Sequence, residues 1–228
     1  MPHAGRIRAT GTCRGIEVMF EVTPKRIAAM RRAMVRLSAV DTRAVSLAFL
    51  DKSEVEGLRG MAAMQSFRTA TPSIEYRGNS VRQDFDVCFP APREGVFDSL
   101  ATCLETVIAG ACGAMRPPPF TERLQLNDFA IQRYPKGSRG IGIHRDGKRY
   151  RGIVAIVTLR GGSRLFTCDD REGRNARALD DRPGRIVLLS AAGFAGREAE
   201  DARPLHGVDR VTGGRLSLGF RYLPPSAA

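Results

Sequence analysis

The chain has 228 residues, 43% of them hydrophobic, which suits one large globular domain and excludes a largely disordered protein. Its formal net charge is +12, but arginine supplies 32 of the 36 cations, an excess that a GC-rich coding genome also produces, so the total charge alone assigns no nucleic-acid partner. Five cysteines without a Cys-x-x-Cys pair argue against a disulfide framework or a zinc knuckle. The longest purely apolar run is too short to span a bilayer. We therefore expect a cytoplasmic protein without a membrane partner.

Two helices and a strand are predicted near the N-terminus. Thr23 and Pro24 can cap and open a helix whose apolar residues recur at helical spacing: Ile27, Met30, Met34 and Leu37. A short strand follows over residues 44–50. Ser53 and Glu56 have the spacing of a capping box and predict the start of a second helix.

The middle of the chain predicts a hairpin and a third helix. The segment 73–89 turns at Gly78-Asn79 and is rich in arginine and aromatic residues. The third helix has one apolar stripe and ends before the prolines at 117–119. Its stripe consists of Val96, Leu100, Cys103, Leu104, Val107 and Ile108.

From Leu124 to Leu223 the chain consists of short apolar or alternating runs separated by turn residues, a spacing typical of a β-sandwich or barrel. No linker is long enough to separate two domains. We therefore expect one α+β domain over 1–228, with a helical and hairpin extension at 1–120, a strand-built core at 121–224, and the helices packed on one sheet.

Two of the three histidines occur in patterns that suit a metal. His144 is followed two residues later by Asp146, and His206 lies near a late strand. Two imidazoles and one carboxylate can occupy one face of an octahedral Fe(II) and leave three positions open, and no thiolate favours zinc instead. His-x-Asp alone arises often by chance.

The residues after His206 strengthen this interpretation. Because side chains alternate along a strand, residues 215, 217, 219 and 221 face one way and the apolar residues between them face the other. An inward-facing arginine is costly without an anion, which a dicarboxylate ligand can provide. Alternatively, Arg215 and Arg221 pair with acidic residues of the chain such as Asp180 or Asp181.

The combination of His-x-Asp, a distant His, Arg-x-Ser and Arg-x5-Arg resembles the Fe(II)/2-oxoglutarate-dependent dioxygenases with a double-stranded β-helix (jelly-roll) core. The segment Gln132-Arg133-Tyr134 before the Pro/Gly turn is more specifically similar to the AlkB-like branch. The resemblance covers roughly the last 100 residues. It implies a jelly-roll core at 121–224, with Fe(II) and O2 and with 2-oxoglutarate as co-substrate, and hydroxylation or oxidative dealkylation as the chemistry.

Carried onto this chain, the resemblance makes His144, Asp146 and His206 the metal ligands and the catalytic centre. Arg215 would bind the distal carboxylate of 2-oxoglutarate. The other residues that it assigns to the co-substrate are Tyr134, Arg221, Gln132 and Ser217, and Arg221 is alternatively a partner that steadies Asp146. Gln132 and Ser217 stand where the branch commonly has asparagine.

Two regions bear on the substrate. Cations follow and flank the His-x-Asp motif and could hold phosphates of single-stranded or damaged DNA or RNA while a base enters the site: Arg139, Arg145, Lys148, Arg149 and Arg151. The hairpin lies where the branch carries a substrate lid, and we expect Tyr76, Arg77 and Phe85 to contact a base there. An ordinary sheet edge explains the hairpin equally well.

Three features favour a smaller substrate. The chain has no tryptophan. After Asp146 it has Gly147, Lys148 and Arg149, where base-repair members tend to have acidic residues, and Arg215 follows His206 by only nine positions. The leading hypothesis, which rests on the resemblance and on the cations near the motif, is nevertheless oxidative demethylation of alkylated nucleic-acid bases. The alternatives are hydroxylation of a small metabolite or natural-product intermediate by the same chemistry, and a non-catalytic jelly-roll binding module.

Overall fold

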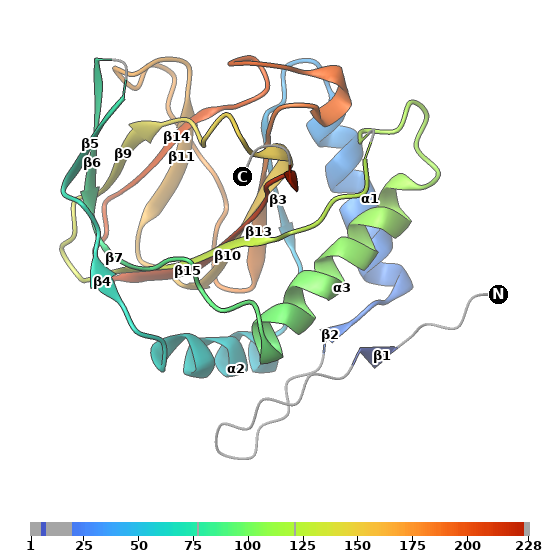
Figure 1. The fold of residues 1–228 in the computed structure, drawn as a ribbon, viewed down its shortest axis with the longest axis horizontal. Helices are drawn as coiled ribbons and strands as arrows, with labels where there is room; N and C mark the ends of the chain where they lie inside the picture. Colours follow the sequence, from blue (N-terminus) through green and yellow to red (C-terminus); the bar gives the residue numbers. More distant parts are fainter. Residues whose placement is uncertain (1–5, 8–19, 77, 121, 226–228) are drawn as a thin grey trace.

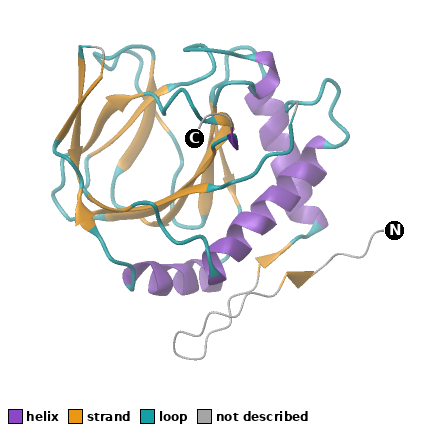
Figure 2. Cartoon of the chain, in the orientation of Figure 1, coloured by secondary structure: helices purple, strands orange, loops and turns teal. Residues whose placement is uncertain are grey.

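The computed structural model describes residues 6–7, 20–76, 78–120 and 122–225. Within them, three α-helices lie along one side of two large antiparallel sheets (Figures 1 and 2). A small sheet of β1 (Arg6–Ile7) and β2 (Phe20–Glu21) precedes the first helix.

The larger sheet has seven strands in the order β3-β13-β10-β15-β8-β7-β4. Strands β8, β10, β13 and β15 come from the segment 121–224, where the strand-built core was predicted. Strands β3, β4 and β7 come from the N-terminal half. The bounds are β3 Ala44–Ala48, β4 Arg68–Thr69, β7 Asp86–Cys88, β8 Asp128–Tyr134, β10 Arg151–Arg160, β13 Arg185–Ser190 and β15 Arg215–Tyr222.

The smaller sheet has six strands in the order β12-β11-β14-β9-β6-β5. The predicted hairpin is present as β5 and β6, and β5 forms an edge of this sheet. The bounds are β5 Ser73–Tyr76, β6 Asn79–Asp84, β9 Gly140–His144, β11 Arg164–Cys168, β12 Arg177–Ala178 and β14 Leu205–Asp209; a 3₁₀ turn η1 (Phe194–Gly196) lies between β13 and β14.

Helix α1 (Pro24–Ser38) begins as predicted. The Thr23 side chain accepts a hydrogen bond from the Arg26 backbone N at 3.2 Å, and Pro24 occupies the first turn, where its missing N–H costs nothing. Met30, Met34 and Leu37 are buried.

Helix α2 (Lys52–Ala63) begins differently from the prediction. The capping box is formed by Asp51 and Glu54, not by Ser53 and Glu56: the Asp51 carboxylate accepts from the Glu54 N, and the Glu54 carboxylate accepts from the Asp51 N, both at 2.9 Å. The prediction was wrong because Asp51 is itself extended and Ser53 already lies inside the helix, where its hydroxyl donates to Asp51.

Helix α3 (Gly95–Cys112) is long and apolar enough to cross a membrane. Eleven of its 18 residues are nevertheless buried inside the protein, which accounts for its apolar composition.

The seven-stranded sheet has a core on each face. On one face, buried residues of all three helices form a single cluster with Phe129, Leu188, Leu218 and Phe220 of the sheet. On the other face, a second cluster lies between the two sheets and includes Tyr134, Val154 and Val208. The second face therefore provides the interior in which polar residues of both sheets can meet.

Candidate metal and co-substrate site

The two histidines lie side by side on neighbouring strands. His144 ends β9, His206 follows the first residue of β14, and the two are direct partners in the antiparallel pairing. Their ring centroids are 4.3 Å apart. The pairing thus brings together two imidazoles that are 62 positions apart in the sequence.

Backbone carbonyls orient both rings. His144 Nδ1 lies 2.8 Å from the Gly142 O, and His206 Nδ1 lies 3.1 Å from the Pro204 O. Because a carbonyl can only accept, we assign the proton to Nδ1 in each ring, which leaves both Nε2 atoms able to bind a metal.

Asp146 completes the cluster. Its Oδ2 lies 3.4 Å from the His206 Nε2, and one ligand atom from each of the three residues falls within 4.8 Å of the others. Burial, with the neighbouring His206, lowers the pKa of His144 to about 4. Burial acts to raise the pKa of Asp146, but the charges of His206 and Arg221 outweigh it and hold that pKa below its usual value. A neutral imidazole and an ionised carboxylate are the forms that bind a metal.

Strand β15 presents a polar face to the same interior. Arg215, Ser217, Gly219 and Arg221 line a cavity together with the histidines and Asp146, while Leu216, Leu218 and Phe220 belong to the core on the helical side. The alternation is the one that the strand period predicts.

The cavity, together with the solvent at its mouth, has a volume of about 440 Å³. Gln132 and Tyr134 of β8 also line it, since Gln132 lies opposite Ser217 and Tyr134 opposite Arg215 in the sheet. Burial raises the pKa of Tyr134, so its hydroxyl stays protonated and able to donate. The remaining wall is apolar and consists of Ile141, Val154, Ile156, Leu165 and Val208.

Arg221 connects the cluster to residues that the motif did not identify. It lies 3.5 Å from Asp146 through Nε and 3.2 Å from Asp128 Oδ1 through Nη1. The other Asp128 oxygen accepts from the Tyr150 hydroxyl at 3.3 Å. Sequence reasoning missed Asp128 because the position of Asp128 opposite Arg221 depends on the register between β8 and β15. The sequence predicts only which face of β8 a residue occupies.

Arg215 is 2% exposed and has an acidic partner from the chain. Its Nη1 pairs with the Asp181 carboxylate and lies 3.2 Å from the Ser163 Oγ, and its Nη2 lies 3.1 Å from the Thr158 Oγ1. Pairing with Asp181 was one of the two alternatives left open by the sequence. The buried Nε makes no hydrogen bond to the described part of the chain, so this guanidinium retains a free donor.

The sequence matches no family model and no curated protein. Solved structures with the same fold include a Trichoplax adhaerens prolyl hydroxylase in complex with a hypoxia-inducible-factor peptide fragment (TM-score 0.62, 14% identity, 89% of this chain and 92% of that one). A 2OG-Fe(II) oxygenase family protein from Burkholderia pseudomallei matches with TM-score 0.55 and 18% identity (85% and 89%), and OsALKBH1 with 0.52 and 16% (78% and 97%).

The fold is that of the Fe(II)/2-oxoglutarate oxygenases. The residues present fit the metal and co-substrate of this enzyme class. Two imidazoles and a carboxylate suit Fe(II), and the free Nε of buried Arg215 suits a carboxylate.

The residues predicted to contact a substrate are dispersed. Arg77 lies outside the described residues, as does the side chain of Tyr76. Phe85 is buried, with its ring 4.9 Å from that of Tyr134, a placement that favours a core role over stacking on a base. Arg139 and Lys148 are exposed.

Among the remaining cations near the site, three contact other parts of the chain. Arg149 lies over the Tyr150 ring at 5.2 Å, Arg151 pairs with Glu198, and Arg145 donates to the Arg203 O. Only part of the predicted cationic group is therefore free to meet a phosphate.

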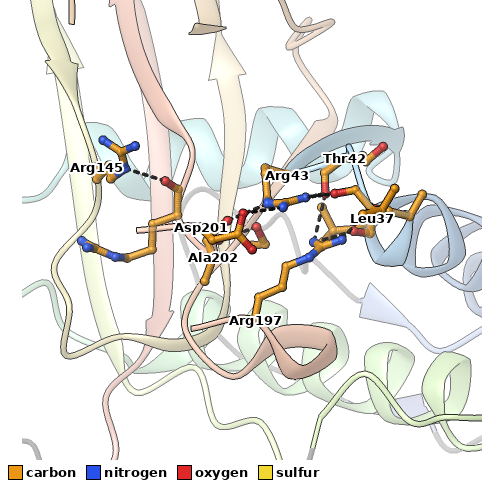
Figure 3. A network of polar contacts seen from close by, with 11 residues as sticks. Leu37, Thr42, Arg43, Arg145, Arg197, Asp201 and Ala202 are labelled. Atoms are coloured by element: carbon orange, nitrogen blue, oxygen red, sulfur yellow. Dashed lines mark hydrogen bonds and ion pairs between the residues drawn. The ribbon is translucent and has the colours of Figure 1, made fainter. Parts of the chain in front are cut away.

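The segment before β14 is attached to the N-terminal half of the chain (Figure 3). Arg43 bonds Asp201 at 2.7 Å, and Arg197 Nη1 bonds the Leu37 O and Thr42 O at 2.9 and 3.0 Å. Two residues further on, Arg203 Nη1 donates to the Asp146 O at 2.7 Å. These contacts fix the backbone that carries His206 and link it to the loop that carries Asp146.

Proposed function

We propose that this protein is an Fe(II)/2-oxoglutarate-dependent dioxygenase. The observation that carries the proposal is one cavity lined both by His144, Asp146 and His206 and by two arginines of β15, the buried Arg215 and the half-buried Arg221. A bound iron would supply the activation of O2, for a reaction in which a substrate C–H becomes C–OH while 2-oxoglutarate becomes succinate and CO2.

The residues of the chain have separate tasks in this reaction. His144, Asp146 and His206 would hold the metal through one ligand atom each, and such a three-residue set would leave metal positions free for the co-substrate and O2. Arg215 binds the distal carboxylate of 2-oxoglutarate, with the Tyr134 hydroxyl as a second donor. Arg221 steadies Asp146, and the apolar wall of the cavity limits the entry of water.

The substrate that we propose first is an alkylated base in DNA or RNA. Hydroxylation of an N-methyl carbon gives an unstable N–CH2OH group, which releases formaldehyde. The exposed Arg139 and Lys148 support this choice, since exposed cations can hold the phosphates of a single strand.

A small molecule is the second candidate, and the burial of Phe85 favours it. With that ring packed on Tyr134, Phe85 is not available to stack on a base. The same chemistry would then hydroxylate a metabolite that enters the cavity.

The decisive experiment incubates the protein with Fe(II), 2-oxoglutarate, ascorbate and short methylated single-stranded DNA and RNA oligonucleotides. Mass spectrometry follows the oligonucleotides, and succinate is measured in the same tubes. His144→Ala is the control, because it removes one metal ligand at the end of β9.

Loss of a methyl group that the control does not show supports base demethylation. Metal-dependent succinate with intact oligonucleotides retains the oxygenase and selects the small-molecule candidate. If anaerobic titration detects no binding of Fe(II) or 2-oxoglutarate, the oxygenase proposal is wrong and a non-catalytic binding module remains.

A further inference from the structure

Asp181 places a carboxylate of the protein against Arg215, the residue proposed to bind the co-substrate. It lies between β12 and β13, and its side chain is 12% exposed. Its Oδ2 pairs with the Arg215 Nη1, while Ser163 and Thr158 accept from the same guanidinium. All these partners use the two terminal nitrogens, and Nε is the donor left over.

The arrangement affects how strongly Arg215 can attract an anion. Asp181 neutralises the arginine charge, and it does not itself line the cavity that the arginine lines. A second carboxylate that enters from the cavity must share the guanidinium with Asp181 or displace it. Either route opposes binding, since two carboxylates on one buried cation repel each other at low dielectric.

We propose that Asp181 is a specificity-determining residue of the co-substrate site, which shares Arg215 with the distal carboxylate of 2-oxoglutarate and weakens the affinity for it. This inference rests on the proposed function. The weaker affinity makes turnover responsive to the 2-oxoglutarate concentration, because a site with a higher Kd is saturated only at a higher concentration of its ligand.

The test is calorimetric titration of 2-oxo acids into the Fe(II)-loaded protein without O2, so that no turnover occurs. Two ligands of equal chain length are compared: 2-oxoglutarate, and 2-oxopentanoate, which lacks the distal carboxylate. In Asp181→Asn, the amide oxygen can still accept from Arg215 but carries no charge. We expect about tenfold tighter binding of 2-oxoglutarate and unchanged binding of 2-oxopentanoate.

Asp180→Asn is the matched control. This substitution removes the same charge at the neighbouring position. Asp180 pairs with Arg182 and Arg185 at the surface and not with Arg215. We expect neither ligand to bind differently to this variant.

Equal or weaker binding of 2-oxoglutarate by Asp181→Asn overturns the inference, as does an equal gain in Asp180→Asn. If the wild type binds neither ligand, both the inference and the proposed function are wrong. If the wild type binds 2-oxoglutarate but Asp181→Asn does not bind it more tightly, only the inference is wrong. Should Asp181→Asn melt below the wild type, Asp181→Ser replaces it, since a hydroxyl can also accept from Arg215 without a charge.

Discussion

The two arginines of β15 have the same charge and face the same cavity, but their partners give them different tasks. Arg215 pairs with Asp181, which does not line the cavity, and its buried Nε makes no hydrogen bond to the described part of the chain. Arg221 lies between Asp128 and Asp146, and these carboxylates raise its pKa although burial opposes this. Nε of Arg221 is likewise buried without a hydrogen bond, but it lies 3.5 Å from Asp146, so the neighbours of the two arginines and not their free donors distinguish their tasks.

Asp128→Asn tests whether Asp128 positions Arg221. Without the Asp128 charge, Arg221 pairs more strongly with Asp146 and competes with the metal for that carboxylate. We expect about tenfold weaker Fe(II) binding, at the lower end of the effect typical of residues that support metal ligands. The measurement is the Kd for Fe(II) without O2.

Asp86→Asn is the control for this change. Asp86 also pairs with an arginine of β8, Arg133 at 2.9 Å, but both side chains are partly exposed and neither lines the cavity. Similar Fe(II) affinities in Asp128→Asn and the wild type would show that Arg221 needs no help from Asp128.

At the scale of the elements, the juxtaposition of the two histidines depends on a close approach of β9 and β14. Gly140 opens β9 with φ +77°, and a Cβ there would lie 1.8 Å from the Val208 O of β14. Only glycine allows both this backbone conformation and this contact. The glycine therefore sets the distance between the strands that carry His144 and His206.

Gly140→Ala should consequently reduce both stability and metal binding. We expect a loss of roughly 3 kcal/mol or more in the free energy of unfolding, since β9 must move away from β14, together with weaker Fe(II) binding. Gly137→Ala is the matched control: its φ is +82°, but nothing lies near its Cβ, so only about 1 kcal/mol should be lost. Urea unfolding measures the free energy of unfolding of both variants. Equal losses in Gly140→Ala and Gly137→Ala would contradict the argument from the close contact with Val208.

The start of α2 gives a second prediction at this scale. Asp51→Ala removes the side chain that accepts from the Glu54 N and should cost about 1 kcal/mol of stability. Ser53→Ala, at the residue that the sequence pattern suggested as the cap, should change stability by less than about 0.5 kcal/mol. Thermal unfolding of the two variants distinguishes the caps, and a larger loss in Ser53→Ala would favour the original assignment.

These elements show which features can be read from the sequence. Strand period predicted which side chains of β15 share a face, and helical spacing predicted the buried side of α1. Pairing partners could not be predicted in the same way. Asp128 reaches Arg221 only through the β8–β15 register, and Asp181 reaches Arg215 from the loop before β13. Periodicity is local, whereas these contacts depend on how distant segments meet.

At the scale of the whole molecule, the seven-stranded sheet separates two interiors with different contents. The helical side is filled by an apolar cluster, and the side between the sheets holds the polar cavity. The segment that leads to His206 is tied by Arg43 and Arg197 to the end of α1 and the start of β3. The N-terminal half therefore supports the site although it supplies none of the three metal-binding residues.

Metal binding should accordingly stabilise the whole fold rather than one loop. The ligands come from β9, the loop after it and β14, and a metal that binds only their folded arrangement stabilises the native state by about 2.7 kcal/mol at a hundred times its Kd. For a chain of this size, that corresponds to a rise in Tm of roughly 5–10 °C. Scanning calorimetry with and without Fe(II), in the absence of O2, measures the shift. His144→Ala should abolish it while melting near the metal-free wild type, and an undiminished shift in that variant would place the metal elsewhere.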